Sequence, residues 1–175
     1  MEPWQITLLV IGIIFLGYVL LFITNIGFVH FFKSTLRKHN KALAVILNTK
    51  YDNLSKLINI TKKLGETFDE DLLNKFYSLE PKDFAKQYTE KCKDARDILS
   101  LLKNQIIYLS STNPSLEKHN EFQLLKDNVI ELDEVYRVNI AMYNADVLGY
   151  NYWIRFLPFR YVFLLLKFKE KDLIS

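Results

Sequence analysis

A long uncharged run near the amino terminus constrains the fold most. Between Gln5 and Phe32 there is no Asp, Glu, Lys or Arg, whereas charged residues recur every few positions from Lys33 onward. A helix needs about 20 apolar residues to cross a hydrocarbon core about 30 Å thick, so residues 4–32 can span a bilayer with some tilt. The run predicts a membrane anchor over residues 1–32, with the lipid bilayer as the partner of residues 4–32.

A cleaved signal peptide is the alternative for this run. Such a peptide begins with basic residues, has a short apolar core and ends at a cleavage site of small residues. The first three residues, Met-Glu-Pro, contain no base, the run is too long, and no Ala-x-Ala follows it. These features favour an uncleaved anchor.

The charges beside the anchor predict its orientation. Glu2 is the only charged side chain before the run, whereas five basic residues follow it before the first acid, Asp52: Lys33, Arg37, Lys38, Lys41 and Lys50. The positive-inside rule then places the N-terminus outside and residues 33–175 in the cytoplasm. Asn25 is a strongly polar side chain well inside the span. It lies near the predicted cytoplasmic interface, so solvation there is favoured over an intramembrane site.

Beyond the anchor, apolar residues recur at steps of three and four, with no sustained strand-like alternation. Three such series predict three long helices. They are Leu43, Leu47, Leu54, Leu57 and Leu64, interrupted by Lys50 and Thr61; Phe84, Tyr88, Cys92, Ala95, Leu99, Leu102, Ile106 and Leu109; and Phe122, Leu125, Val129, Leu132, Tyr136, Ile140, Tyr143, Val147, Tyr150, Ile154 and Leu157. A short helix, Glu70–Leu79, has Asp69 available as its N-cap. Since nothing between Phe32 and Ala42 breaks a helix, the anchor can continue into the first series.

These helices can bury their apolar faces only against each other. They predict an all-α fold, in which one N-terminal transmembrane helix is followed by an antiparallel bundle of three long helices and a short one. Gly65, a turn at Ser110–Pro114 and Pro158 are the expected boundaries, which gives a bundle over residues 33–158 and a C-terminal tail over residues 159–175. The last helix is long for a compact domain, so its end is expected to project.

The position of the tail depends on the path of the chain. If the three long helices simply alternate in direction, residues 159–175 lie far from the bilayer. If the short helix reverses the chain instead, the tail lies at the membrane surface, where Arg155, Arg160, Lys167 and Lys169 suit anionic lipid. The sequence leaves both paths open.

Motifs for catalysis or cofactor binding are missing from the sequence. It has no GxxxxGK[ST] or GxGxxG phosphate loop, and its three histidines form no pair at helical spacing. The acids at 69–71 fit the first turn of a helix, and Cys92 lies on an apolar series as a packed thiol. Acidic and basic residues alternate, so no basic face suits nucleic acid. We expect no enzyme activity, no catalytic, cofactor-binding or metal residues, and no nucleic-acid partner.

An enzyme or metal-dependent protein with an unfamiliar site between helices is the remaining alternative class. A cation held by a buried cluster of Glu131, Asp133 or Glu134 would support it.

The dipeptide Tyr-Asn occurs twice, at Tyr143-Asn144 and Tyr150-Asn151, seven residues apart. Both tyrosines fall on the third apolar series, two helical turns apart, and each asparagine stands one residue to the side. We expect the tyrosine rings to be buried with their hydroxyls paired, and the asparagines to hydrogen-bond across the flank of the helix. A role in helix packing is favoured over a ligand site.

Three segments resemble those of the LemA family in order and spacing. Val45–Leu64 is similar to the family's early helix, with Ser55-Lys56 in place of its usual Pro-Asn. Asn113–Leu125 is similar to its Pro-Asp-Leu-x-x-Asn-x-x-Phe segment, with one residue fewer. Tyr143–Pro158 resembles its closing signature, Tyr-Asn-x-x-Val-x-x-Tyr-Asn followed by an aromatic-Pro pair, with leucine as the aromatic residue's replacement. Leu166–Lys169 takes the place of the family's Gly-Phe-Lys.

The resemblance implies a cytoplasmic helical bundle on one membrane span, without catalytic residues to carry over; some relatives are associated with magnetosome membranes. We therefore expect a bacterial inner-membrane protein whose bundle serves as a scaffold or adaptor. A protein partner or self-association is expected at exposed apolar residues. These are Trp153, Phe159, Tyr161, Phe163 and Phe168. A homo-oligomeric membrane-shaping protein, in which the last helix pairs with its copy, is the alternative.

Overall fold

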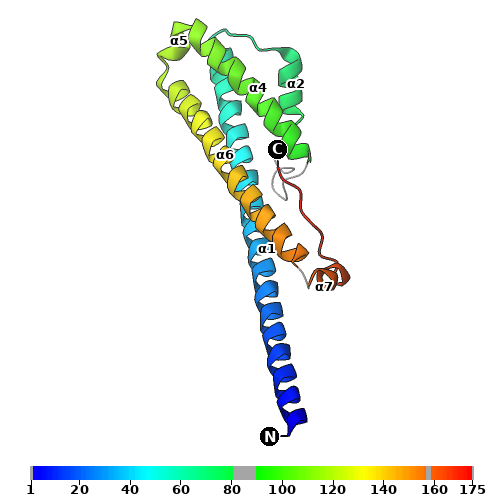
Figure 1. Ribbon diagram of the computed structural model, residues 1–175. Coiled ribbons are helices and arrows are strands. Elements are labelled where there is room, and N and C mark those ends of the chain that lie inside the picture. Colours follow the sequence, from blue (N-terminus) through cyan, green and yellow to red (C-terminus); the bar gives the residue numbers. More distant parts are fainter. Residues whose placement is uncertain (1, 81–89, 157–158, 175) are drawn as a thin grey trace. The chain divides into compact units, whose positions relative to one another are not determined.

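The computed structural model describes residues 2–80, 90–156 and 159–174 (Figure 1). Its helices are α1 (Pro3–Lys63), α2 (Glu70–Tyr77), α4 (Glu90–Thr112), α5 (Pro114–Glu117), α6 (Asn120–Arg155) and α7 (Arg160–Leu165). Within these described ranges there is no strand, and the predicted all-α fold, with a long apolar N-terminal helix followed by further helices, is confirmed.

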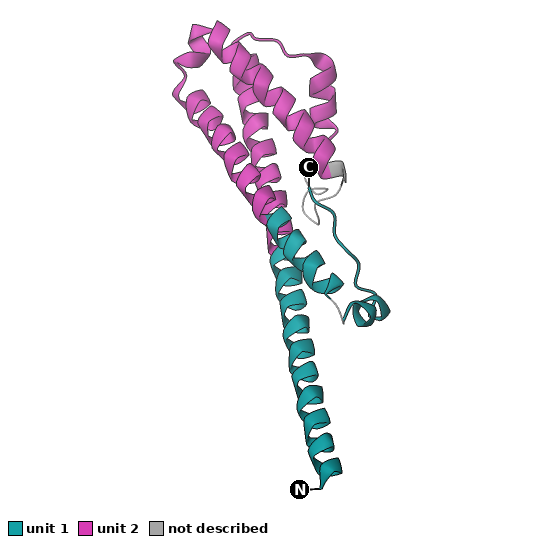
Figure 2. Cartoon of the chain, in the orientation of Figure 1, with its two compact units in different colours: residues 1–37, 143–175 teal, residues 38–142 magenta. Residues whose placement is uncertain are grey.

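The chain forms two compact units, coloured separately in Figure 2. Unit 1 consists of residues 1–37 and 143–175, and unit 2 consists of residues 38–142. The predicted boundaries of the segments 1–32, 33–158 and 159–175 stay predictions, and Pro158 lies outside the described residues.

The anchor continues without a break into the first bundle helix, as the sequence predicted, because α1 runs from Pro3 to Lys63. It contains an 18-residue window with a mean hydropathy of 2.9, none of it buried, which is long and apolar enough to cross a membrane. The helix ends where Gly65 adopts a φ of +86°, a left-handed conformation that favours glycine. There the amide of Glu66 donates to the carbonyl of Thr61 over 3.2 Å, which closes the helix end.

In unit 2 the buried residues follow the three predicted series. Buried members are Leu43, Leu47, Leu54, Leu57, Cys92, Ala95, Leu99, Leu102, Ile106, Phe122, Leu125, Val129 and Tyr136. Leu64 is exposed, and Phe84 and Tyr88 lie outside the described residues. The interruptions at Lys50 and Thr61 are buried as well. Thr61 satisfies its hydroxyl by donating to the carbonyl of Leu57 over 2.8 Å, so a polar residue can occupy the apolar face.

The short helix reverses the chain. Asp69 caps α2 by accepting the amides of Asp71 and Leu72, as predicted. In Figure 1, α2 runs opposite to the preceding part of α1, and α4 and α6 then alternate in direction within unit 2. This is the second of the two paths that the sequence left open.

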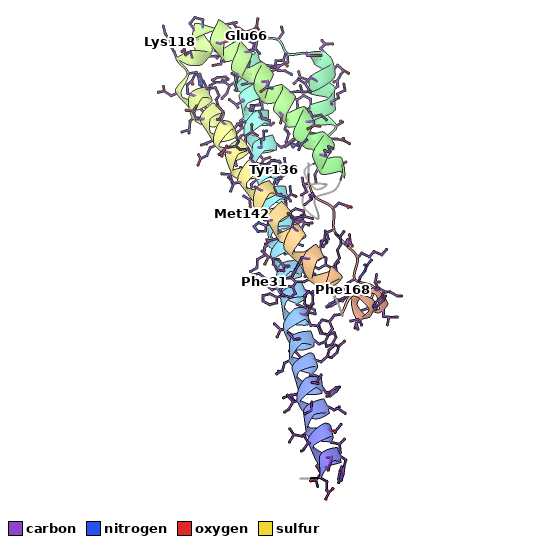
Figure 3. The ribbon with its side chains drawn as sticks, viewed as in Figure 1. Phe31, Glu66, Lys118, Tyr136, Met142 and Phe168 are labelled. Carbon is purple, nitrogen blue, oxygen red and sulfur yellow. The ribbon has the colours of Figure 1, made fainter. Side chains whose placement is uncertain are left out.

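The turn predicted at Ser110–Pro114 is shorter than expected, since α4 remains helical to Thr112. Ser111 and Thr112 donate to the carbonyl of Tyr108 over 2.7 Å and 3.3 Å, which pairs a carbonyl of the last turn. Asn113 then caps α5, with Pro114 in its first turn. Asn113 also donates to the carboxylate of Glu66, labelled in Figure 3, over 2.7 Å, so it ties the two loops of unit 2 together.

In unit 1 the end of α6 packs antiparallel on α1. The rings of Trp153 and Phe28 stack at 4.5 Å, and one turn earlier on α6 a Cβ added to Gly149 would lie 2.6 Å from the ring of Phe32. The backbones therefore approach closely at Gly149. The expectation that this end of α6 projects is wrong, because the aromatic and branched residues on its inner face are covered by α1. The shared core comprises Val29, Leu36, Tyr143, Val147, Tyr150, Ile154, Phe159 and Phe163.

Asn25 lies at the start of this packed region and is only 1% exposed. Its side-chain amide has no hydrogen-bond partner among the described residues. The interpretation that solvent surrounds Asn25 is therefore wrong, because α1 is already covered by protein at this position.

A turn in the tail, directly after α7, places Lys167 in a strained conformation. After α7, the amides of Lys167 and Phe168 donate to the carbonyls of Leu164 and Phe163, each over 3.0 Å, and the rings of Phe163 and Phe168 meet edge to face at 5.5 Å. This closes the helix with a left-handed residue, which is usually glycine. Here the residue is Lys167, with a φ of +59°. It stands where the Gly-Phe-Lys segment of the LemA family has its glycine.

Replacing Lys167 by glycine should strengthen this turn, because a side chain in the left-handed region costs about 1 kcal/mol that glycine avoids. The amide of Phe168 donates across the turn. It should therefore exchange with solvent about fivefold more slowly in Lys167→Gly. Lys169→Gly is the control, because Lys169 is not in the left-handed region. Equal slowing in both variants would contradict the strain at Lys167.

Candidate functional site: a clamp for the C-terminal tail

The two asparagines of the Tyr-Asn repeat hold the tail. Asn144 donates from Nδ2 to the carbonyl of Ile174 over 2.8 Å, and its Oδ1 accepts the amide of Ile174, also over 2.8 Å. Asn151 makes the same pair of bonds with the carbonyl and the amide of Lys171, over 2.9 Å and 3.0 Å. Each asparagine thus satisfies both backbone groups of one tail residue, and we call Asn144 and Asn151 the asparagine clamp.

The spacing of the repeat matches that of an extended chain. Seven residues of helix rise about 10.5 Å, and three residues of extended chain cover about 10 Å. The residue later on α6, Asn151, holds the earlier tail residue, Lys171, so the tail runs antiparallel to α6. The clamp contacts the backbone alone and places no demand on the side chains at 171 and 174.

Further contacts fix the tail between α7 and the clamp. Phe168, labelled in Figure 3, packs against Phe163, meets the ring of His30 at 6.5 Å and lies under the ammonium group of Lys33, 5.4 Å from its centroid. Arg155 donates twice to the carboxylate of Glu170, with its Nε 2.6 Å from Oε1. These hydrogen bonds raise the pKa of Arg155 and lower that of Glu170. Arg155, one of the cations predicted to suit lipid, is therefore paired within the protein.

The tyrosines of the repeat are buried, as predicted. Tyr143 and Tyr150 are 7% and 3% exposed and belong to the core of unit 1. Burial raises the pKa of Tyr150 above its ordinary value, because its phenolate would be poorly solvated. The repeat is therefore a packing device, and its asparagines act on the tail.

The predicted interaction residues do not form one exposed surface. Phe159 and Phe163 are buried, so the expectation that they are exposed is wrong: both rings fill the core between α1 and α6. Trp153 and Phe168 are partly buried against the same core. Tyr161 alone of the five is largely exposed, at 70%.

Glu131, Asp133 and Glu134, the acids considered for a cation site, do not form a cluster. Asp133 pairs with Lys50 and, over 2.6 Å, with Lys103, while Glu131 is exposed and Glu134 pairs with Arg137 at the surface. In the described part of the chain, no three His, Cys, Asp or Glu side chains gather as a metal site would require. The three acids thus do not converge.

Lys50 and Asp133 form a charged contact inside unit 2. Burial lowers the pKa of Lys50, and the hydrogen bond and charge of Asp133 only partly offset this effect. Burial also acts to raise the pKa of Asp133, but hydrogen bonds from Lys103 and Lys50 outweigh it and leave that pKa below its ordinary value. A carboxyl whose pKa is lowered by folding stabilises the fold above its unfolded pKa, near 4, and loses that contribution as the pH falls through its folded pKa.

Asp133→Asn should destabilise the protein by about 3 kcal/mol, because it leaves the Lys50 ammonium buried without a counter-charge. The pH dependence that Asp133 contributes below about pH 4 should vanish in this variant. Lys50→Met is the matched variant, since it removes the buried charge and leaves Asp133 paired with Lys103. It should cost less than about 1 kcal/mol. Chemical denaturation of the full chain in detergent measures both, and the reverse order would contradict a buried charge pair.

Asn151→Ala should release the tail, because two hydrogen bonds of about 0.5–1.5 kcal/mol each are lost. Hydrogen exchange at the amide of Lys171 should accelerate at least about fivefold. Asn139→Ala is the control on the same helix, because Asn139 donates only to the carbonyl of Val135 on α6 itself. If the tail amides exchanged at the same rate in both variants, the clamp would be refuted.

The comparison with protein families agrees with this architecture. The model of the LemA family matches residues 39–175, a range that includes most of the bundle, the Tyr-Asn repeat and the tail. No curated protein and no solved structure matches the chain. Because the match covers well over half of the chain, the protein belongs to the LemA family.

Proposed function

We propose that the protein is a non-catalytic scaffold or adaptor, anchored by α1 in the bacterial inner membrane with its N-terminus outside and its bundle in the cytoplasm. Membership of the LemA family and the candidate span in α1 support a membrane-anchored helical protein. The orientation rests on the basic residues after the anchor. The absence of catalysis rests on the absence of a catalytic motif in the sequence.

An exposed apolar face of α6 carries the adaptor proposal. Val135, Val138 and Met142 follow one another at steps of three and four and are 40%, 42% and 52% exposed. Tyr136, on the same helix, is buried, so the helix presents one face to the bundle and another to its surroundings (both Tyr136 and Met142 are labelled in Figure 3). Such a face matches the spacing by which one amphipathic helix packs on another.

The same face favours self-association as the second candidate function. If α6 packs on α6 of a second copy, Val135, Val138 and Met142 face their own counterparts, as in a symmetric dimer. This is the membrane-shaping alternative, and it differs from the adaptor only in the identity of the partner.

Photo-crosslinking in the native cell distinguishes the two. A photoreactive residue at Val138 or at Met142 should yield the same adduct with another protein, and the same residue at Lys56, exposed elsewhere in unit 2, should not. An adduct of twice the 20.7 kDa chain mass indicates self-association instead. If neither position on α6 yields a protein adduct in the native membrane, both candidates are wrong.

A charge on the face should weaken the adduct. Val135→Lys places an ammonium group among the apolar contacts and should reduce crosslinking from Met142 several-fold. Ala141→Lys is the matched control, because Ala141 is exposed beside Met142 in sequence but lies about 100° around the helix from it. Equal loss in both variants would argue against this face as the contact.

A further inference from the structure

The tail lies beside the predicted membrane segment. The ring of Phe159, which precedes α7, packs against Tyr18 and Phe22 of α1, with centroids 5.0 Å and 5.1 Å apart. Both partners lie inside the uncharged run. The clamp and these aromatic contacts belong to unit 1, so α7 is held against α1 at this level.

The length of uncovered α1 locates the edge of the bilayer core. Residues 3–18 of α1 are exposed, although Tyr18 already meets the ring of Phe159, and partial burial begins at Val19 and Phe22. A helix of about 20 residues crosses the hydrocarbon core. On this basis we place the inner boundary of that core near the level of Phe22, within the uncharged run.

The exposed side of α7 suits this level. Tyr161, Leu164, Leu165 and Leu166 are 70%, 57%, 83% and 56% exposed. Four large apolar side chains on so short a segment would be unfavourable in water, whereas lipid at the edge of the bilayer accommodates them.

A lysine-rich hollow lies next to this apolar segment. It has a volume of about 310 Å³ and is lined by Lys33, Tyr150 and residues 166–171. We call this cavity the lysine hollow. The lysines that line it are Lys33, Lys167, Lys169 and Lys171. Lys33 comes directly after the uncharged run, and the other three are brought to it by the asparagine clamp and the turn at Lys167.

The lysines of the hollow have no ion-pair partner among the residues that the structure describes. Glu170 is the one acid in its lining, and Arg155 already holds both of its carboxylate oxygens. Throughout residues 2–80, 90–156 and 159–174, no carboxylate forms an ion pair with any lysine of the hollow. Four lysines thus line a space of small-molecule size without a carboxylate partner among the described residues.

We propose that the lysine hollow binds the phosphate of an anionic lipid headgroup at the inner surface of the membrane. Ammonium groups bind phosphate as point charges, and basic residues beside a membrane span attract anionic lipid. The leucines of α7 select a lipid over a free phosphate, because they provide acyl chains with a contact surface beside the charges. The inference rests on the proposed membrane anchoring and is independent of the adaptor role.

Native mass spectrometry of the full chain in neutral detergent tests the proposal. Phosphatidylglycerol is titrated against phosphatidylcholine, and bound lipids are counted. The variant K33Q/K167Q/K169Q/K171Q removes the hollow's charge. The control K41Q/K56Q/K63Q/K118Q removes the same charge from exposed positions of unit 2. We expect at least tenfold preference for phosphatidylglycerol in the wild type and the control, and its loss in the hollow variant.

Several outcomes would overturn the proposal. Equal loss in both quadruple variants would mean a general charge effect, and equal binding of the two lipids would mean no headgroup site. Displacement of phosphatidylglycerol by an equal concentration of glycerol phosphate would identify a free-anion site instead of a lipid site. Should the quadruple variant lose its helical signal, the pair K33Q/K169Q, made on exposed side chains, replaces it with the same expectation. Alkaline extraction of cell membranes separately tests the anchoring: release of the wild-type chain would refute the anchor, whereas retention without lipid preference would refute only the lysine hollow.

Discussion

Hydrogen bonds between two asparagine side chains and the backbone of the tail determine how the C-terminal part of unit 1 is built. The part of the tail after α7 has no helix to pair its backbone groups, and groups left unpaired beside a packed core would be costly. Asn144 and Asn151 supply both a donor and an acceptor to each clamped residue. The extended tail is thereby fixed along α6 without a β-strand partner. The Phe168 ring and the lysines of the tail depend on this attachment for their positions.

Helical periodicity predicted most of the fold because burial repeats with the helix. The members of the apolar series in the described parts of the chain are mostly buried, and the Asp69 cap was readable from residue type and position. Lys50 shows the limit of this reasoning: a lysine in an apolar series looks like an interruption, yet Asp133, distant in sequence, allows it to be buried. A partner 83 residues away leaves no local signal.

The path of the chain and the role of the asparagines were beyond the reach of the sequence for a related reason. Parity of three helices placed the tail at one end of the bundle or the other, and the direction of the short helix α2 decided between them. The Tyr-Asn repeat correctly predicted packing of α6, but a spacing of seven residues is equally suited to a second helix. Only the structure shows that its partner is extended chain, for which the same distance corresponds to three residues. Lys167 likewise gives no sequence signal of its left-handed conformation beyond the glycine of the resembling segment.

The attachment of the tail is also the basis of the lipid binding that we propose. The packing of Phe159 on Tyr18 and Phe22 brings the exposed leucines of α7 next to α1 at the level where its burial begins.

The register of the tail on α6 is the central claim, and nuclear Overhauser contacts in the full chain, isotope-labelled in lipid nanodiscs, test it most directly. The side-chain amide of Asn151 should show a contact with the backbone amide of Lys171, and that of Asn144 with the backbone amide of Ile174. Contacts in a shifted register, or tail amides without any contact to either asparagine, would contradict the account.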